Sequence, residues 1–465
     1  MALALSGLAC NFAYDVIENT TGISLGGEET AESPAPAVDE APAPDNEAPV
    51  EPSADPEPAS TDTPPDQAIS PDVREQMEQI ETEVILLRGL QPSGPIDRNL
   101  LSEDGLRDYV VNDFFGDYTR EESEDDARLY ALLGLVEPGF NIYDLFLDLY
   151  SEGIAGFYDP DAREMFVVQD SRFGGPERLT YAHEYAHVLQ DQVFDLREGM
   201  EWSDDACEDE SERCAAIKAL IEGDATLLEE RWLLTYASDA DFQQLLDFYN
   251  SYSSPTYESA PQFLKDDFLF PYTTGYDFIE RFFLDGGWAA VDELYLNPPI
   301  STEQILHPGR YPADVPVRLA TPELLESIGP DWREMDQDVL GEWYTLLTLR
   351  EYLPDEEAQV AAEGWGGDYY VALHNDSAEE DILVLATEWD TVRDAHDFYG
   401  AFRDYGHARF GDRTTSSTTR SIWESRGEWN SIEIIGDQTL WILAPDAETG
   451  ETIRTSLAFP ADRAD

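Results

Sequence analysis

Apolar residues recur at helical spacing through most of the chain up to about residue 352. Beyond that point they mainly alternate as they do in strands. The clearest helical pattern covers residues 176–196, with Pro176 in the first turn, where proline suits a helix. The same spacing predicts further helices over residues 71–90, 102–115, 121–135, 142–150, 213–237, 241–249, 274–284 and 340–352.

Just before the helix predicted at 176–196, the pattern changes to short apolar runs. Residues 156–168 contain two such runs around the turn Asp159-Pro160-Asp161, which predicts a β-hairpin. A strand directly before that helix can offer an edge onto which an extended peptide adds. An ordinary structural hairpin is the equal alternative.

The tail has strand-like alternation with one amphipathic helix, over residues 391–410. The predicted strands are 368–374, 382–389, 420–423, 429–435, 439–444 and 453–459. One helix covering such strands gives a small α+β domain. We therefore expect an α+β protein in which residues 71–330 form a mainly helical domain with a short hairpin. Residues 331–465 should add a C-terminal helix and a small α+β domain.

The first 70 residues differ in composition from the rest of the chain. Residues 28–70 are rich in Pro, Ala, Asp and Glu and contain no Lys or Arg. Such a segment cannot bury enough apolar surface to offset the loss of conformational entropy, so we expect a disordered, extended tether. Residues 1–27 would then be a leader, although they lack a basic region and have only a short apolar run.

The three cysteines give evidence on whether the protein is exported. Cys10 ends the segment Gly7-Leu8-Ala9-Cys10, which resembles an imperfect lipobox, while Cys207 and Cys214 have six residues between them in an acidic stretch. One lipid-modified cysteine and one disulfide would account for all three, and both would imply an exported protein. The alternative for Cys10 is a chain start that happens to contain a cysteine. A lipid anchor through Cys10 would hold the protein at the cell surface.

The formal net charge is −72, from 99 acidic and 27 basic residues. An electrostatic nucleic-acid binder needs the opposite sign, so that class is excluded. Charge of this size repels itself strongly unless salt screens it, which favours adaptation to high salt. An acidic surface that meets a cationic partner is the alternative.

The predicted helix 176–196 carries the segment His183-Glu184-Tyr185-Ala186-His187. Histidines at positions i and i+4 lie one above the other on a helix, so both imidazoles can reach one ion. Glu184 lies about 100° round the helix from His183, where it can meet a metal-bound water instead of the metal. This is the H-E-x-x-H arrangement of zinc enzymes. Catalytic zinc takes three protein ligands, so a third ligand must come from elsewhere in the chain.

We predict that Glu222 is this third ligand. It lies in a later predicted helix beside Gly223, which would let two helices approach closely. A carboxylate there completes a His-His-Glu set. Metal-bound imidazoles usually donate their other N–H to a carboxylate or carbonyl, and Asp191 and Asp224 are the candidates for that role.

Three segments of the chain carry a resemblance to known proteins: His183-Glu184-Tyr185-Ala186-His187-Val188-Leu189-Gln190-Asp191-Gln192, Glu222-Gly223-Asp224-Ala225 and Ser301-Thr302-Glu303-Gln304-Ile305-Leu306-His307-Pro308. Together they resemble a family of predicted gluzincin-type surface metalloproteases of halophilic archaea and some bacteria. The resemblance runs from about residue 71 into the tail and includes Gly364-Trp365-Gly366-Gly367-Asp368. It implies a zincin-like fold for residues 71–330, a zinc ion held by His183, His187 and Glu222, and Glu184 as the base. Many gluzincins hold a histidine with an aspartate four residues after the glutamate ligand, but here that position is Thr226.

The sequence therefore predicts a zinc metallopeptidase, exported or surface-anchored, that acts on a peptide or protein. His307 could donate to the substrate oxygen as it becomes an oxyanion, or could be a surface or capping residue. Tyr272 and Tyr276 are rival donors for that role. Two other functions are open: zinc-dependent hydrolysis of a non-peptide bond, and a non-catalytic surface protein with a structural zinc site.

Overall fold

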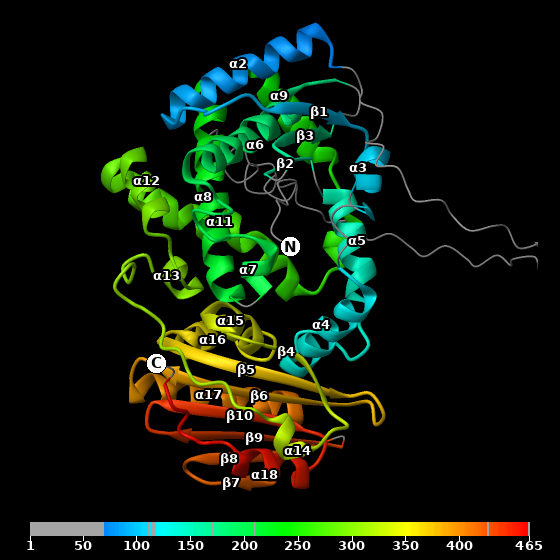
Figure 1. The fold of residues 1–465 in the computed structure, drawn as a ribbon, viewed down its shortest axis with the longest axis vertical. Helices are drawn as coiled ribbons and strands as arrows, with labels where there is room; N and C mark the ends of the chain where they lie inside the picture. Colours follow the sequence, from blue (N-terminus) through cyan, green and yellow to red (C-terminus); the bar gives the residue numbers. More distant parts are fainter. Residues whose placement is uncertain are drawn as a thin grey trace, which may run out of the picture.

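The computed structural model describes residues 69–109, 111–112, 118–153, 155–160, 162–168, 172–208, 210–425 and 427–463. The predicted leader, Cys10 and nearly all of the predicted tether lie outside these residues. In the described part of the chain, helices gather at one end and a large sheet at the other (Figure 1). The protein is thus a mainly helical α+β protein with two sheets.

The helices before the tail largely follow the apolar periodicity. For α2 (Pro71–Arg88), Ser70 accepts a hydrogen bond from the Val73 N–H and Pro71 stands at the first helical position. The predicted helix 102–115 is described only as α3, and its predicted end falls partly outside the described residues. The others are α3 (Glu103–Tyr109), α4 (Arg120–Leu133), α5 (Ile142–Gly153), α6 (Gly175–Phe194), α7 (Asp204–Glu208), α8 (Ser211–Tyr236), α9 (Asp239–Ser251), α10 (Pro255–Ser259), α11 (Gln262–Gly286), α12 (Trp288–Leu296) and α13 (Thr302–Leu306).

A three-stranded sheet lies beside α6. The predicted hairpin is confirmed as β2 (Gly156–Asp159) and β3 (Glu164–Val168). A strand that we did not predict, β1 (Asp97–Leu101), pairs in parallel with the other side of β3. The strand directly before α6 is therefore central, and our expectation that it offers an edge is wrong. The edge strand on the hairpin side is β2.

The tail forms a seven-stranded sheet in the order β4-β5-β6-β10-β9-β8-β7. Its strands are β4 (Arg333–Asp338), β5 (Trp365–Asn375), β6 (Glu380–Trp389), β7 (Thr415–Ser416), β8 (Arg420–Ser425), β9 (Glu428–Ile435) and β10 (Gln438–Ala444). The helices are α14 (Leu325–Ile328), α15 (Gly341–Arg350), α16 (Asp355–Ala362), α17 (Val392–Phe410) and α18 (Ala447–Ser456).

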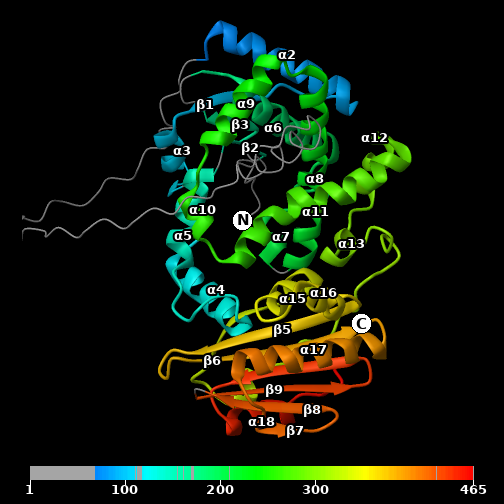
Figure 2. The ribbon, with the colours of Figure 1, turned by 180° about the vertical axis from the view of Figure 1, so that it is seen from behind.

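Helices cover both faces of this sheet. The predicted helix α17 packs on one face, where Trp389, Phe398, Phe402 and Trp441 are buried (Figure 2). On the opposite face α14 and α18 lie in front of the strands (Figure 1). Residues 453–459 were predicted as a strand, which is wrong, because α18 begins after Asp446, which caps it, and runs to Ser456.

The buried apolar residues form three clusters. One surrounds α2, α6 and α9, and another lies under α18 on the outer face of the tail sheet. The largest is continuous from α4, α5, α8 and α11 through α15 and α16 to the inner face of the tail sheet. No helix in the described part of the chain is long and apolar enough to cross a membrane.

A disulfide joins Cys207 of α7 to Cys214 of α8, which confirms the predicted pairing. Its position ties α7 to the first turns of α8.

Candidate metal centre

Helix α6 carries His183, Glu184 and His187 on its buried face. The helix starts with Pro176 near its first position, and Glu177 caps it by accepting from the Gly174 N–H at 2.8 Å. The two imidazole rings lie 4.9 Å apart between centroids, as expected for a pair one helical turn apart.

Helix α8 brings Glu222 to these histidines. Its Oε2 lies 3.3 Å from His183 Nε2 and 3.4 Å from His187 Nε2, and the two Nε2 atoms are 3.2 Å apart. Ligands bound to zinc at about 2.0–2.1 Å in a tetrahedron are about 3.3–3.4 Å from one another. The three atoms thus form one face of a tetrahedron of the size that zinc requires. The structure brings the three predicted ligands together, and their spacing fits the ion.

This group is buried in the protein. The exposed fraction is 1% for His183, 2% for Glu222 and 0% for Glu184. Burial alone would raise the pKa of Glu222, but the two histidines outweigh burial and hold that pKa well below its usual range. Burial alone would lower the pKa of His183, but Glu222 and Glu229 outweigh it and raise that pKa well above its usual value. Glu222 is therefore an ionised carboxylate beside the two imidazole rings.

A carboxylate missed by the sequence analysis holds the other nitrogen of His183. Glu229 Oε2 lies 2.9 Å from His183 Nδ1. Glu229 follows Glu222 by seven residues, two turns of α8, so the spacing could have revealed it. Thr226 does not take this role, because its hydroxyl donates to the Glu222 carbonyl oxygen at 2.7 Å.

The second predicted ligand, His187, contacts Gln190, which the sequence analysis also missed. Gln190 Oε1 lies 2.8 Å from His187 Nδ1, and Gln190 Nε2 donates to Asp224 Oδ2 at 3.1 Å. Asp224 thus reaches His187 only through Gln190. Asp191, predicted for the same role, instead accepts from the Tyr158 hydroxyl at 2.9 Å.

The edge strand β2 lies close to Glu184. A Cβ at Gly156 would stand 2.8 Å from Thr180 Cγ2 and 3.4 Å from Glu184 Cγ. Only glycine allows this approach of strand and helix. The predicted base therefore lies next to the edge strand of the small sheet.

Tyr272, Tyr276 and His307 are the candidate donors to the substrate oxygen. Of these, only Tyr272 lies near the predicted metal ligands. Its ring centroid is 6.3 Å from that of His183, and its buried hydroxyl has no hydrogen bond of normal geometry among the described residues. Burial, with Glu222 and Glu184 nearby, raises the pKa of Tyr272 well above its usual value, so the hydroxyl keeps its proton. Tyr276 donates to Glu230 at 2.9 Å. The structure does not bring His307 to this group, since its Nε2 lies 2.8 Å from Glu342 Oε1 on α15.

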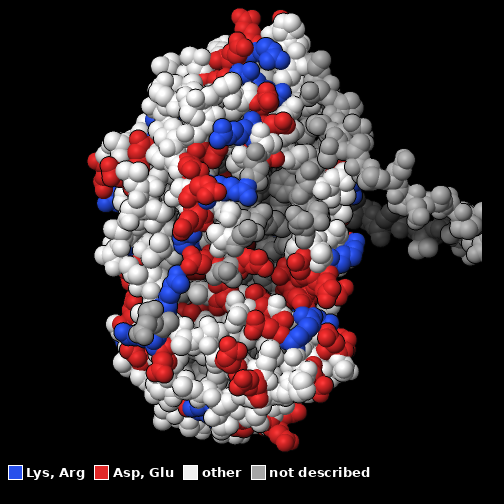
Figure 3. Space-filling view, in the orientation of Figure 1, with Lys and Arg blue, Asp and Glu red and all other residues white. Residues whose placement is uncertain are grey.

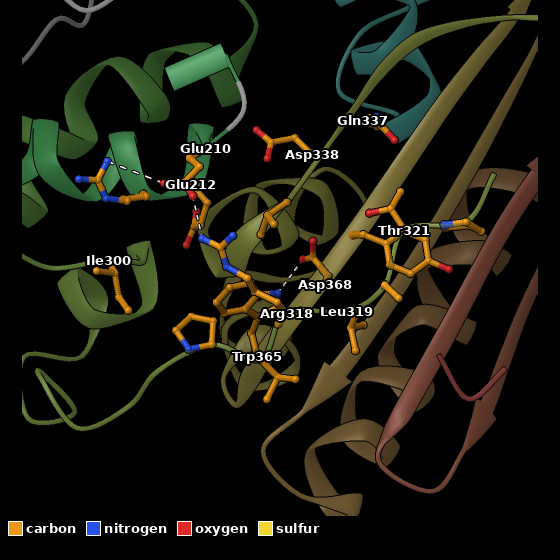
Figure 4. Close-up of a pocket in the computed structure, with 18 of the residues that line it drawn as sticks. Glu210, Glu212, Ile300, Arg318, Leu319, Thr321, Gln337, Asp338, Trp365 and Asp368 are labelled. Carbon is orange, nitrogen blue, oxygen red and sulfur yellow. Dashed lines mark hydrogen bonds and ion pairs between the residues drawn. The ribbon is translucent and has the colours of Figure 1, made fainter. Parts of the chain in front are cut away.

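Two other features lie outside this centre. Oxygens of Glu303, Asp314 and Asp390 lie within 4.8 Å of one another, but Arg310 Nη1 pairs with all three and fills the space that a cation would take. A cavity of about 900 Å³ lies between the start of α8 and the tail sheet (Figure 4). It contains Glu212, which is ten residues, or about 15 Å along the helix axis, from Glu222. Neither feature includes a predicted ligand.

Residues 327–454 match the model of a domain of unknown function, DUF8575, which covers the tail sheet from β4 into α18. No curated protein and no solved structure matches the chain.

Proposed function

We propose that this protein is a zinc-dependent metallopeptidase with His183, His187 and Glu222 as the metal ligands. The observation that carries the proposal is the triangle of buried Nε2, Nε2 and Oε2 atoms with edges of 3.2–3.4 Å. The resemblance to gluzincin-type surface metalloproteases supports it. Zinc held there would supply a Lewis acid that polarises a substrate carbonyl and makes water more acidic.

The side chains around the ligands have distinct roles in this proposal. Glu184 accepts a proton from the attacking water and passes it to the leaving amine as the C–N bond breaks. Tyr272 donates a hydrogen bond to the carbonyl oxygen as negative charge develops on it. Edge strand β2 positions the peptide, since an extended chain can pair with its backbone.

We also propose an exported location, because the disulfide between Cys207 and Cys214 is typical of oxidising compartments. The lipid anchor at Cys10 stays a prediction.

A structural zinc site is the second candidate function. The burial of both histidines, Glu222 and Glu184 favours it, since structural sites are closed to solvent. Nothing in the described residues favours a non-peptide substrate.

Glu184→Gln distinguishes the two functions, because it removes the proton acceptor and keeps the shape of the side chain. We expect about one zinc per chain in both the natural protein and the variant, measured by metal analysis. Hydrolysis of an unstructured protein substrate should be lost in the variant only. His183→Ala and Glu222→Ala should lose or strongly weaken zinc binding. Full activity in Glu184→Gln would refute the mechanism, while zinc without activity in the natural protein would favour the structural site.

A further inference from the structure

The Gln190 side chain lies between a predicted metal ligand and a buried ion pair. It is 1% exposed. Its Nε2 lies 3.0 Å from the Ile221 carbonyl oxygen and 3.1 Å from Asp224 Oδ2, while its Oε1 lies 2.8 Å from His187 Nδ1.

These neighbours fix which end of the amide is nitrogen. The carbonyl and the carboxylate can only accept, so the amide group that faces them must be the NH₂. The oxygen then faces His187, and an oxygen can only accept. The hydrogen must therefore sit on His187 Nδ1, which leaves the lone pair of the neutral ring on Nε2. Nε2 is the atom in the ligand triangle.

Asp224 is itself held from a distant part of the chain. Arg88 Nε donates to Asp224 Oδ1 at 2.9 Å, Arg88 Nη2 donates to Oδ2 at 3.2 Å, and the Tyr295 hydroxyl donates to Oδ2 at 2.8 Å. A guanidinium that donates to both oxygens fixes the plane of a carboxylate as well as its charge. Asp224 therefore cannot turn away from Gln190.

Arg88 is also fixed. It is the last residue of α2, followed by Gly89 with φ of 83°, and its side chain is almost fully buried. It donates to Asp292 at 2.6 Å and lies 4.6 Å from the centroid of the Trp288 ring. The desolvation cost of a buried charge pair can exceed its Coulombic gain, so the observed contacts of Arg88 are evidence of its fixed position and not of added stability.

We propose that Arg88, Asp224 and Gln190 form a positioning relay that keeps the proton of His187 on Nδ1 and so presents Nε2 to the metal. The relay rests on the proposed metal site. It makes Arg88, the last residue of α2 and 95 residues before His183, part of the support of the site. His183 has a different support, because a carboxylate, Glu229, faces its Nδ1.

Gln190→Met tests the relay in the full chain, because methionine keeps the volume and cannot accept from His187. Outer-shell changes of this kind typically weaken metal binding by 10–100-fold. We expect a loss in that range for zinc affinity, measured by competition with a coloured chelator. Gln192→Met is the matched control. Gln192 lies on the same helix and accepts from the N–H groups of Ser93 and Gly94 after α2, without touching a ligand. Gln192→Met should change zinc affinity by less than roughly threefold, well below the 10–100-fold loss expected for Gln190→Met.

A second measurement is the rate at which the Nδ1 proton of His187 exchanges with water. With zinc bound and histidine labelled with ¹⁵N, the Nδ1 proton of His187 should exchange slowly with water in the natural protein. It should exchange fast in Gln190→Met, and a purely structural role for Gln190 would not change it. Unchanged affinity and slow exchange in Gln190→Met would overturn the relay, as would an equal loss of affinity in Gln192→Met.

If Gln190→Met does not fold, Arg88→Lys tests the relay, because lysine keeps the charge but lacks the planar pair of N–H donors that fixes the plane of the Asp224 carboxylate. We expect a smaller loss of affinity in the same direction, and natural affinity with slow exchange would overturn the relay. If the natural protein does not bind zinc, the proposed function fails as well. If it binds zinc and these variants bind equally well, only the relay fails.

Discussion

Gly223 of α8 lies directly against Gly275 of α11, so close that a Cβ on Gly223 would stand 2.3 Å from the Gly275 carbonyl oxygen. A Cβ on Gly275 would in turn stand 2.3 Å from the Ala219 carbonyl oxygen. The two backbones thus touch without side chains between them. Glu222 precedes the first glycine, and Tyr272 lies one turn before the second. This contact therefore sets the distance between a predicted ligand and a predicted substrate-binding hydroxyl.

Gly223→Ala and Gly275→Ala should each destabilise the protein. Alanine favours a helix over glycine, but each new methyl group would meet backbone atoms that can move only with their helix. Overpacking of this kind costs about 1–3 kcal/mol, and we expect at least that loss of unfolding free energy. Denaturant unfolding in high salt measures it. Gly400→Ala is the control, because α17 has open space there, and it should gain about 0.5–1 kcal/mol. Equal stability of all three variants would contradict the close helix contact.

Tyr272→Phe should lower peptide hydrolysis and leave zinc binding unchanged. Removal of one donor to a developing oxyanion typically costs about 10²–10³-fold in kcat, and we expect a loss in that range. His307→Gln is the comparison, since glutamine can still donate to Glu342, and it should change kcat by less than roughly threefold, far below that cost. Steady-state kinetics with one peptide compares both. A large loss in His307→Gln with none in Tyr272→Phe would restore His307 as the donor.

Two buried carboxyl groups in the cavity of Figure 4 give an expected pH dependence of stability. Burial raises the pKa of Glu212 to about 8 against the hydrogen bonds from Thr302, with the charges of Asp368 and Glu342 acting in the same direction as burial. Burial likewise raises the pKa of Asp368 to about 7. The folded protein then binds more protons than the unfolded chain between about pH 4 and 8. Stability should therefore be greatest at the acidic end of this window and fall as the pH rises.

Glu212→Gln should flatten that decline. The amide oxygen can still accept from the Thr302 N–H and hydroxyl, which bond Glu212 Oε1 at 2.6 and 2.8 Å in the natural protein, but no buried charge forms. Melting temperatures between pH 5 and 9 in molar chloride, where surface charges are screened, measure the slope. Compared with the natural protein, the variant should gain most stability at the alkaline end of this range, at pH 8–9. Glu210→Gln, at the partly exposed rim of the cavity, is the control. Its melting temperature should fall with pH as steeply as that of the natural protein. If the melting temperature of Glu212→Gln falls with pH as steeply as that of the natural protein, Glu212 is not the group that titrates.

Local sequence patterns predicted much of the fold and of the candidate metal centre. His183 and His187 follow from the i, i+4 rule, and Gly223 beside Glu222 indicates the close helix contact from the sequence alone. The strand β1 was missed because its sequence Asp97-Arg98-Asn99-Leu100-Leu101 has few residues that favour strands. Residues 453–459 alternate like a strand, but the cap at Asp446 starts a helix before them.

The supporting residues could not be predicted in the same way. Arg88 meets Asp224 across 136 residues, and no local period links the two. In the sequence, Gln190 is an ordinary polar residue of a predicted helix. Its role follows only from its contact with Asp224 in the folded protein. His307 was a candidate donor to the substrate because it lies in a segment that carries the family resemblance, but its contact is Glu342, 35 residues later on α15. Long-range contacts of polar residues leave no periodic signal.

The acidic surface gives the last prediction. Removing the 12 acidic residues between Glu28 and Asp66 would change the formal charge only from −72 to −60. Figure 3 shows acidic side chains over much of one face, where they outnumber basic ones and gather near its middle. The folded part of the chain therefore carries most of the charge, and its carboxylates repel one another.

Salt should stabilise this protein steeply. The screening length is about 30 Å at 0.01 M salt and about 3 Å at 1 M. Repulsion then reaches across a domain in dilute buffer and only between neighbours in molar salt. Unfolding separates the charges, so screening favours the folded state, and sodium and potassium chloride should act alike. Melting temperatures from 0.01 M to molar chloride should rise both for the full chain and for a chain that starts at Pro71. A flat melting temperature would show that the acidic surface is tolerated without screening, and the inferred high-salt environment would lose its physical basis.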